Sequence, residues 1–462
     1  MASQNCGKLP LLTEETLANK KLPVILVLFP NEWDRAELES PRFAKRYRFF
    51  YEGFDLFTFP ENARLMWLDA RRFIRKMQAK YRDRGVAAVM SSEELFGAMF
   101  AAVLARRMGL PGTNPAAVLT AQHKYYARRL IAELAPEASI RFEVFDYREP
   151  TPDRITLPFP LFVKPVKATY SILARRVENF AELKEHLTFK PFEKHILERL
   201  TLPANQLNDD FMGFAVDVHH IVAEEVVEGM QVTVEGFAQE GRVTIFGVID
   251  SVMFPGTSAF ERFEDPSRLP PEVQARLHAL TEKLIAGFGF DHGMFNAEYF
   301  YQPETGAIKV IEINPRIAYQ FADLYLKVDG FSSYECQIAL ALGVNAGAGA
   351  GAETGVLAGA GGDANAVVKR RAGRYKHAAS FVLRSFEQKP LRRVPSLARI
   401  AEIERRFEDS RIMVYVKRGA SLAREFKWLG SYRYCLINLG GHSHDDLRHR
   451  YHAARRELAF EF

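Results

Sequence analysis

The sequence predicts an α/β domain at the N-terminus, a larger α+β body behind it, and a smaller α+β domain at the C-terminus. Three patterns indicate this order: apolar runs that alternate with helical periodicity, then strands that pair as hairpins, then a glycine and alanine tract before the last strands. The chain has 462 residues, of which 48% are apolar and 26% charged, so it is neither a disordered nor a fibrous protein.

The N-terminal α/β domain is expected over residues 1–112. Residues 22–29 (LPVILVLF) form an apolar run rich in branched side chains, which is typical of a buried parallel strand. No GxGxxG follows this run, so the dinucleotide-binding fingerprint is absent. Ser92 is placed to cap a helix at 93–108 that Gly109 ends. The other expected elements are strands at 54–59 and 85–90 and a helix at 62–82.

The central body is expected over residues 113–343. Short turns at 239–241 and 303–306 each separate two strand-like runs, which predicts two β-hairpins. Antiparallel pairing of this kind, mixed with helices, predicts an α+β architecture. The strands expected here are 142–145, 161–164, 219–227, 231–238, 242–249, 294–301 and 308–313.

A tract of glycine, alanine and small polar residues at 344–366 is typical of a flexible linker. The segment 367–462 after it is basic, with 22 Lys and Arg against 10 Asp and Glu, whereas the first 366 residues have 40 against 47. The arginine pairs are dispersed and are not interleaved with aromatic residues, so nucleic acid is not expected as a partner. The expected elements are strands at 378–383, 412–416 and 434–439 and a helix at 445–458 that Ser443 caps.

Several protein classes are excluded by absences. Cys6, Cys336 and Cys435 lie far apart, which excludes a disulfide framework and a zinc ribbon. The first residues lack the apolar core of a signal peptide, and no run approaches about 18 apolar residues, so no transmembrane helix is expected. We therefore expect a soluble cytoplasmic protein with no membrane partner.

The most informative segment is FNAEYF (295–300) followed by IEINPR (311–316). Alternate residues of a strand share one face, so Glu312, Asn314 and Arg316 lie on the same face, and an antiparallel neighbour can bring Glu298 opposite them. Two carboxylates and an amide oxygen suit Mg²⁺, and the guanidinium suits a transferring phosphoryl group. A solvated strand pair is the alternative, but the apolar neighbours favour a buried site.

Two further features can bind a nucleotide. Lys124 opens an expected helix, and Lys164 ends an expected strand beside Pro165, so both present a cation to a cleft. The segment 223–231 (AEEVVEGMQ) has an expected bend at Gly229 that would expose backbone groups to an adenine edge. Taken singly, each feature is more often a solvated lysine or a charged turn.

In this order and spacing the three features resemble the ATP-grasp superfamily, and in particular its carboxylate–amine ligases, including the L-amino-acid ligase and biotin-carboxylase-like branches. The resemblance implies an ATP-grasp fold: residues 1–112 as the preceding domain, 113–343 as the ATP-grasp domain with a mobile lid at about 151–228, 344–366 as a linker and 367–462 as the trailing domain. IEINPR is the most specific motif.

The resemblance also implies a role for each matching residue, with ATP and Mg²⁺ as cofactors and Mn²⁺ as an alternative to Mg²⁺. Gln231 stands where the family often has a ribose-binding carboxylate, and the phosphate loop 165–171 lacks the family's glycines. The implied phosphate ligands are Lys124, Lys164 and Ser171; the implied adenine contacts are the Glu224 carboxylate and the backbone of Glu225 and Val227; the implied metal ligands are Glu298, Glu312 and Asn314; and the implied catalytic residues are Arg316 and Lys164.

The implied reaction activates a small-molecule carboxylate as an acyl phosphate, which an amine then attacks to give an amide, ADP and phosphate. Two alternatives stay open: activation of bicarbonate, as in biotin carboxylase, and nucleotide binding without chemistry. A homodimer is a family-level expectation.

Overall fold

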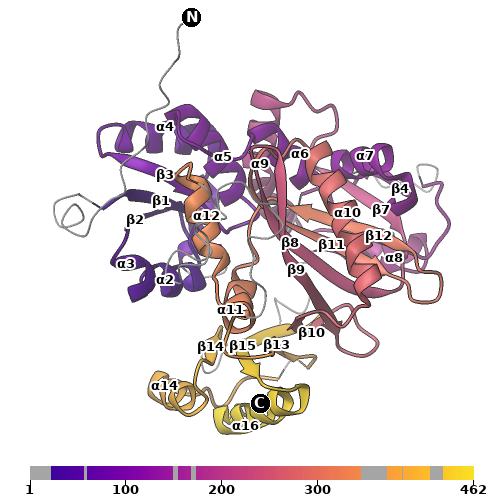
Figure 1. Ribbon diagram of the computed structural model, residues 1–462. Coiled ribbons are helices and arrows are strands. Elements are labelled where there is room, and N and C mark those ends of the chain that lie inside the picture. Colours follow the sequence, from indigo (N-terminus) through magenta and orange to yellow (C-terminus); the bar gives the residue numbers. More distant parts are fainter. Residues whose placement is uncertain are drawn as a thin grey trace, which may run out of the picture.

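The computed structural model describes residues 22–56, 60–148, 155–167, 173–344, 372–387, 389–416 and 430–462. In these residues the strands form a three-stranded, a four-stranded and an eight-stranded sheet. Figure 1 shows the smallest sheet on the left, the eight-stranded sheet running from the centre to the C-terminal strands at the bottom, and the four-stranded sheet on the right.

The N-terminal sheet is parallel, with the order β2-β1-β3, and contains β1 (Val24–Leu28), β2 (Arg48–Glu52) and β3 (Val86–Met90). The strand expected at 54–59 is wrong for its described part, because residues 54–56 are not in a strand. Gly53 takes a φ of 99° directly after β2, and the Phe54 ring then packs edge-on against Phe29 at 5.4 Å. The apolar side chain of Phe54 therefore fills the core from a loop and not from a strand.

The helices of this domain begin later than the sequence predicts. The helix expected at 62–82 is a 3₁₀ helix η1 (Glu61–Trp67) followed by α4 (Ala70–Tyr81), which Asp69 caps at 2.7 Å from the Arg72 N–H. The helix expected at 93–108 is α5 (Gly97–Met108). The expected Ser92 cap is wrong, because the Glu93 carboxylate takes the N–H groups of residues 95–97 and the Ser92 hydroxyl donates to Asp34. Short helices α2 (Glu32–Leu38) and α3 (Pro41–Ala44) follow β1.

The four-stranded sheet has the order β4-β7-β5-β6 and is antiparallel. One face packs against two helices, since Val163 and Ile221 of the sheet share a core with Leu183 and Leu197 of those helices. The N-terminal domain leads into this sheet through α6 (Pro115–Gln122) and α7 (Lys124–Leu134). Its elements are β4 (Phe142–Asp146), β5 (Leu161–Pro165), β6 (Arg175–Val177), β7 (His220–Glu225), α8 (Phe180–His186) and α9 (Pro191–Phe211).

The eight-stranded sheet is antiparallel, with the order β12-β11-β8-β9-β10-β13-β15-β14. The last three strands in this order come from the C-terminal segment, so they continue the central sheet. Every strand expected between residues 142 and 313, and those expected after residue 377, is confirmed, whereas β6 and β10 were not predicted. The strands are β8 (Met230–Gln239), β9 (Arg242–Met253), β10 (Phe260–Asp265), β11 (His292–Tyr301), β12 (Ile308–Asn314), β13 (His377–Ser385), β14 (Arg411–Val414) and β15 (Tyr432–Gly441).

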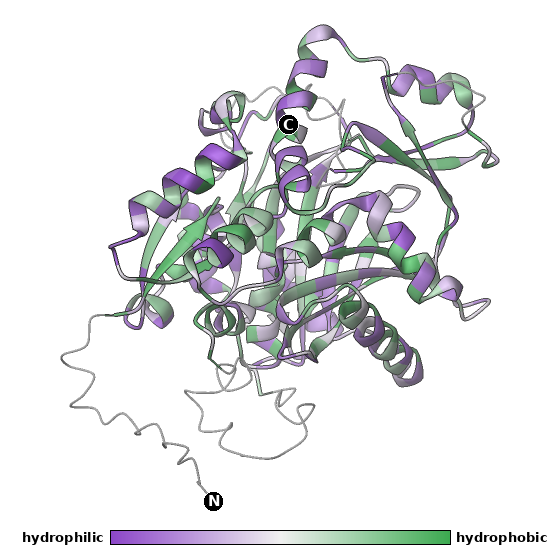
Figure 2. Ribbon diagram, turned by 90° about the horizontal axis from the view of Figure 1, so that it is seen from above, coloured by the Kyte–Doolittle hydropathy of each residue, from purple (hydrophilic) through white to green (hydrophobic). Residues whose placement is uncertain are grey.

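Helices cover both faces of the large sheet. One face carries α10 (Pro271–Gly287) and, over the C-terminal strands, α14 (Leu397–Arg406) and α16 (His444–Leu458). The other face carries α11 (Tyr319–Val328) over β13 and β15, and α12 (Ser333–Ala341) over β11. The Ser443 cap of α16 is confirmed, with the hydroxyl 3.1 Å from the Asp446 N–H. Figure 2 shows hydrophobic strands at the centre and helices with hydrophilic residues around them.

The described helices include none that is long and apolar enough to cross a membrane. The linker predicted at 344–366 lies outside the described residues except for Val344. The domain bounds 1–112, 113–343 and 367–462, and the lid bounds 151–228, stay predictions.

Candidate active site

The predicted acidic residues meet on one face of β8, β11 and β12. In the ladder Glu298 lies opposite Glu312 on one side and Thr233 on the other, and cross-strand partners share a face. The Asn314 amide donates to one oxygen of Glu298 at 3.2 Å, and the Gln231 amide donates to the other at 2.8 Å. The structure thus brings together the three predicted metal ligands and the predicted ribose contact.

The two carboxylates have opposite pKa shifts. Burial and the charge of Glu312 raise the pKa of Glu298 to about 8. Burial would also raise the pKa of Glu312, but Lys124 and Lys164 outweigh it and lower this pKa to about 2. Lys124 Nζ lies 3.3 Å from Glu312 Oε2. Two half-buried carboxylates that face each other, with the buried Asn314 amide beside them, fit a divalent cation.

The metal set is incomplete without ligands from elsewhere. Across the described ranges, no three His, Cys, Asp or Glu side chains gather as a metal site. The predicted set has two carboxylates and one amide, so phosphate oxygens and water would have to fill the remaining positions around Mg²⁺.

Lys164 points into the same space from the end of β5 and is paired with Glu224. Lys164 Nζ lies 2.9 Å from one oxygen of Glu224, and Arg128 Nε lies 2.5 Å from the other. All three side chains are buried. Burial raises the pKa of Glu224, but the charges of Arg128 and Lys164 reverse this and lower it.

Arg128 is a site residue that the sequence reasoning missed. Its guanidinium also donates to the carbonyl oxygens of Val310 and Ile311 on β12, so it joins α7 to the strand that carries Glu312. One signal was available: Arg128 follows Lys124 by one helical turn and therefore shares its face.

The predicted adenine contacts lie around the end of β7. Both oxygens of Glu224 face cations, so an adenine amino group would have to displace one of them. The Glu225 carboxylate accepts from the Arg141 side chain at 2.6 Å, and its backbone N–H donates to the Arg141 carbonyl at 3.0 Å. Val227 lies in the connection between β7 and β8. Adenine recognition at these residues stays a prediction.

Arg316 extends from the loop after β12 to the N-terminal domain. Its Nε lies 3.2 Å from Glu94 Oε2, and the two side chains are only 15% and 12% exposed. Glu94 was not predicted, although it follows β3 at the carboxyl edge of a parallel sheet, where ligands bind in open α/β folds. The Arg316–Glu94 pair joins this edge to the acidic face.

The phosphate loop is described only at its two ends. Ser171, a predicted phosphate ligand, lies outside the described residues. Lys167 is buried, and its ammonium donates to the Glu94 carbonyl at 3.3 Å. Burial lowers the pKa of Lys167 to about 7, with Glu94 opposing and Lys124 adding to this shift.

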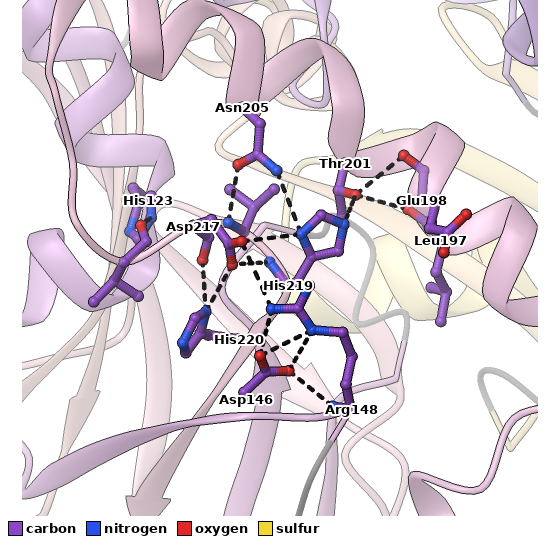
Figure 3. A network of polar contacts seen from close by, with 12 residues as sticks. His123, Asp146, Arg148, Leu197, Glu198, Thr201, Asn205, Asp217, His219 and His220 are labelled. Carbon is purple, nitrogen blue, oxygen red and sulfur yellow. Dashed lines mark hydrogen bonds and ion pairs between the residues drawn. The ribbon is translucent and has the colours of Figure 1, made fainter.

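A polar network fastens α9 to the four-stranded sheet. Figure 3 shows Asp217 between the rings of His219 and His220, with Thr201 and Asn205 approaching from α9. Asp217 lies 3.2 Å from His219 Nδ1 and 2.8 Å from His220 Nδ1, and Asn205 accepts from the Val218 N–H at 3.0 Å. Hydrogen bonds from His220 and His219 outweigh partial burial and lower the pKa of Asp217. The network therefore joins α9 to the start of β7 in the four-stranded sheet.

Comparison with known proteins identifies the fold. Residues 157–324 match the model of the ATP-grasp domain family. The L-amino acid ligase from Bacillus licheniformis superposes with a TM-score of 0.67 at 16% identity, covering 96% of this chain and 100% of that chain. Carboxyaminoimidazole ribonucleotide synthase from Aspergillus clavatus, complexed with ATP, has a TM-score of 0.60 at 14% identity, covering 95% and 98%. Biotin carboxylase from Campylobacter jejuni has a TM-score of 0.57 at 13% identity, covering 96% and 92%.

The chain has the ATP-grasp fold, as the sequence predicts, and the match to the ATP-grasp domain family covers residues 157–324. No curated protein matches the chain in sequence. The matched range contains the predicted site residues except Lys124, which precedes it on α7.

Proposed function

We propose that this protein is an ATP-dependent ligase that activates a substrate carboxylate as an acyl phosphate and couples it to an amine. One observation carries the proposal: Glu298, Glu312 and Asn314 share a half-buried face on which Lys124 and Lys164 converge. This combination suits a metal-bound triphosphate whose γ-phosphoryl group is transferred.

The side chains divide the work by their position. Lys124 and Lys164 would hold phosphate oxygens, and each would exchange its carboxylate partner for a phosphate. Arg316 would leave Glu94 to neutralise charge on the transferring phosphoryl group. Glu298, Glu312 and Asn314 would hold Mg²⁺, which when bound would supply positive charge to the phosphate groups. Asn314 and Lys164 are buried and Glu298 and Glu312 are half-buried, which supports exclusion of water, as an acyl phosphate requires.

Glu94 favours a substrate that carries an ammonium group. Once Arg316 has turned to the transferring phosphoryl group, the Glu94 carboxylate is left to pair with a cation, which an amino acid supplies as its ammonium group. We therefore propose amino acids as the first substrates to test. The name of the L-amino acid ligase with the same fold agrees with this choice.

The test is release of ADP and phosphate from ATP and Mg²⁺, with amino acids and other acids crossed with amines and products identified by mass. Acid-dependent ADP release with an amide of the expected mass supports the ligase. The Glu312→Gln variant should lose at least about tenfold in kcat, because it removes the negative charge of one metal ligand. Unchanged ADP release in this variant would refute the metal assignment.

Two other outcomes have their own signatures. Release of ADP that requires bicarbonate and biotin would indicate the biotin carboxylase type of reaction, whose fold this chain shares. Nucleotide binding without turnover across the panel would indicate a non-catalytic protein. A homodimer and a cytoplasmic location stay predictions, the latter based on the dispersed cysteines.

A further inference from the structure

Glu235 is a buried acid that the predicted site does not use. It lies on β8, opposite Asn296 of β11 and Gly247 of β9, and its side chain is fully buried. Asn296 in turn lies opposite Asn314, so Glu235 belongs to the row of residues next to the predicted metal ligands. Burial of a carboxyl group lowers the stability of the folded chain unless the group is hydrogen-bonded or paired with a charge.

Glu235 has two partners, the Tyr325 hydroxyl of α11 and the backbone of the segment that carries Arg316. Glu235 Oε1 accepts from the N–H of Ala318 at 2.5 Å. Ala318 is the N-cap residue of α11, and its own side chain cannot cap the helix. Glu235 therefore supplies, from β8, an acceptor at the start of α11.

The segment between β12 and α11 is thus fixed at both ends. At one end the Arg316 N–H donates to the Asn314 carbonyl at 2.9 Å, and at the other end the Ala318 N–H donates to Glu235. Only Pro315 and Ile317 flank Arg316 inside this span. The direction in which the guanidinium leaves the backbone therefore depends on the Glu235 bond.

We propose that Glu235 is a positioning residue, which holds the Arg316 backbone so that the guanidinium reaches the transferring phosphoryl group. The role rests on the proposed ligase function. It requires an acceptor oxygen at residue 235, and an amide oxygen supplies one as well as a carboxyl does. Burial raises the pKa of Glu235 to about 8, so the group is mainly a neutral acid near pH 7, which agrees with the sufficiency of a neutral acceptor.

The experiment is a double-mutant cycle with Glu235→Ala, Glu235→Gln, Arg316→Ala and the Glu235→Ala/Arg316→Ala double variant. Glu404→Ala is the matched control, since Glu404 also accepts a backbone N–H, that of Ile412 at 2.8 Å, in the C-terminal segment. The readouts are kcat for acid-dependent ADP release, KM for ATP, and the thermal unfolding midpoint of each variant.

Glu235→Ala should lower kcat about tenfold to a hundredfold with little change in KM for ATP, whereas Glu235→Gln should stay within about threefold of the wild type. When Arg316 is already alanine, the additional Glu235→Ala change should lower kcat by almost nothing further. The proposal is overturned if Glu235→Ala lowers kcat by the same factor with and without Arg316, if Glu235→Gln is as impaired as Glu235→Ala, or if Glu404→Ala lowers kcat to the same degree.

A second measurement separates this proposal from the ligase proposal. If the wild type releases no ADP with any acid, the same cycle is measured on binding of ADP with aluminium fluoride and Mg²⁺, in which the fluoride complex mimics the transferring phosphoryl group. Glu235→Ala and Arg316→Ala should then weaken binding by similar factors that do not multiply in the double variant. Additive losses, or no loss in Glu235→Ala, would refute the positioning role even though the ligase proposal had already failed.

Discussion

Ionisable side chains at the candidate site differ in pKa because their neighbours differ. Lys124, at 3.3 Å, helps to lower the pKa of Glu312, whereas burial and the charge of Glu312 raise the pKa of Glu298. The same logic separates Glu224, held between two cations, from Glu235, whose main partner is a backbone N–H. Position in the sheet therefore determines which acid keeps its proton.

Glu235 should make stability depend on pH in a predictable direction. Its pKa is about 8 in the folded chain and near the ordinary value of 4.5 in the unfolded chain, so between these values the folded chain binds more protons. The free energy of unfolding of the wild type, minus that of Glu235→Gln, should therefore fall from pH 5 to pH 8, by at most about 1.4 kcal/mol per unit. Urea unfolding of both chains, without nucleotide or metal, measures this difference. A difference that stays constant with pH would contradict it.

Arg128 should be essential for stability rather than for catalysis. Arg128→Met would leave Glu224 with Lys164 alone and would remove the donors from two β12 carbonyl groups, so we expect a loss of about 3 kcal/mol in the free energy of unfolding. Adding Glu224→Gln to this variant should lower the free energy of unfolding further, because the buried Lys164 ammonium then loses the carboxylate that pairs with it at 2.9 Å. Chemical denaturation of the three chains checks both expectations, and a gain of stability in the double variant would contradict the charge argument.

At the residue scale, the sequence could predict side chains that share a strand face but not those that meet across elements. Glu312 and Asn314 are two residues apart on a strand, so a period of two is sufficient to place them together. Glu94, Arg128 and Glu235 reach the site from another sheet, a helix and a neighbouring strand. Their proximity depends on the packing of elements, which one sequence does not contain.

At the element scale, strands were predictable where hydrophobic runs pair locally, and boundaries failed where a side chain competed for the backbone. The β8–β9 hairpin turn was predicted from its residues, and Glu240 and Gly241 both take positive φ there. The start of α5 was not predicted, because Glu93 takes N–H groups that another helical turn would use. The sequence does not distinguish a glutamate whose carboxylate caps a helix from a glutamate that lies on the helix surface.

The β8–β9 pair contains two glycines that should respond very differently to alanine. A Cβ at Gly236 would lie 2.1 Å from the Thr244 carbonyl oxygen and 2.8 Å from the Phe295 ring, whereas a Cβ at Gly247 meets nothing within 4 Å. Gly236→Ala should therefore cost at least about 2 kcal/mol in the free energy of unfolding, and Gly247→Ala less than about 0.5. Thermal or urea unfolding of the two variants measures this contrast. Equal effects would show that the register shift between Glu235 and Gly236 does not require glycine.

At the scale of the whole molecule, the C-terminal segment belongs to the central sheet. β13 pairs with β10 from Asp265 to Arg262, and Asn438 of β15 donates to the Gln320 carbonyl of α11 at 3.0 Å. The same segment contacts the N-terminal domain, since Arg411 pairs with Glu37 at 2.7 Å. The basic character of this segment is partly neutralised within it, because Arg406 pairs with Glu457.

These contacts predict that the chain stays together when it is cut between Val344 and Ala372. We expect the two fragments, released by an engineered protease site, to co-elute in gel filtration, because the β10–β13 ladder and the contacts of Arg411 and Asn438 join them. The matched control is the cut chain with Ser380→Pro, which removes a ladder N–H from β13 and should release the fragment. Separation of the unmodified fragments without denaturant would refute the prediction.

The continuity of the sheet across the β10–β13 junction has a consequence for the history of the chain. Since the strands before Val344 and after Ala372 are held by their ladder, the length of the connection between them is not what aligns them. Loop-closure entropy grows only with the logarithm of length, so added residues there cost little. Insertions, or even a whole inserted module, should therefore be tolerated at this point more readily than within the described elements, and chains with this fold can be expected to differ in length there.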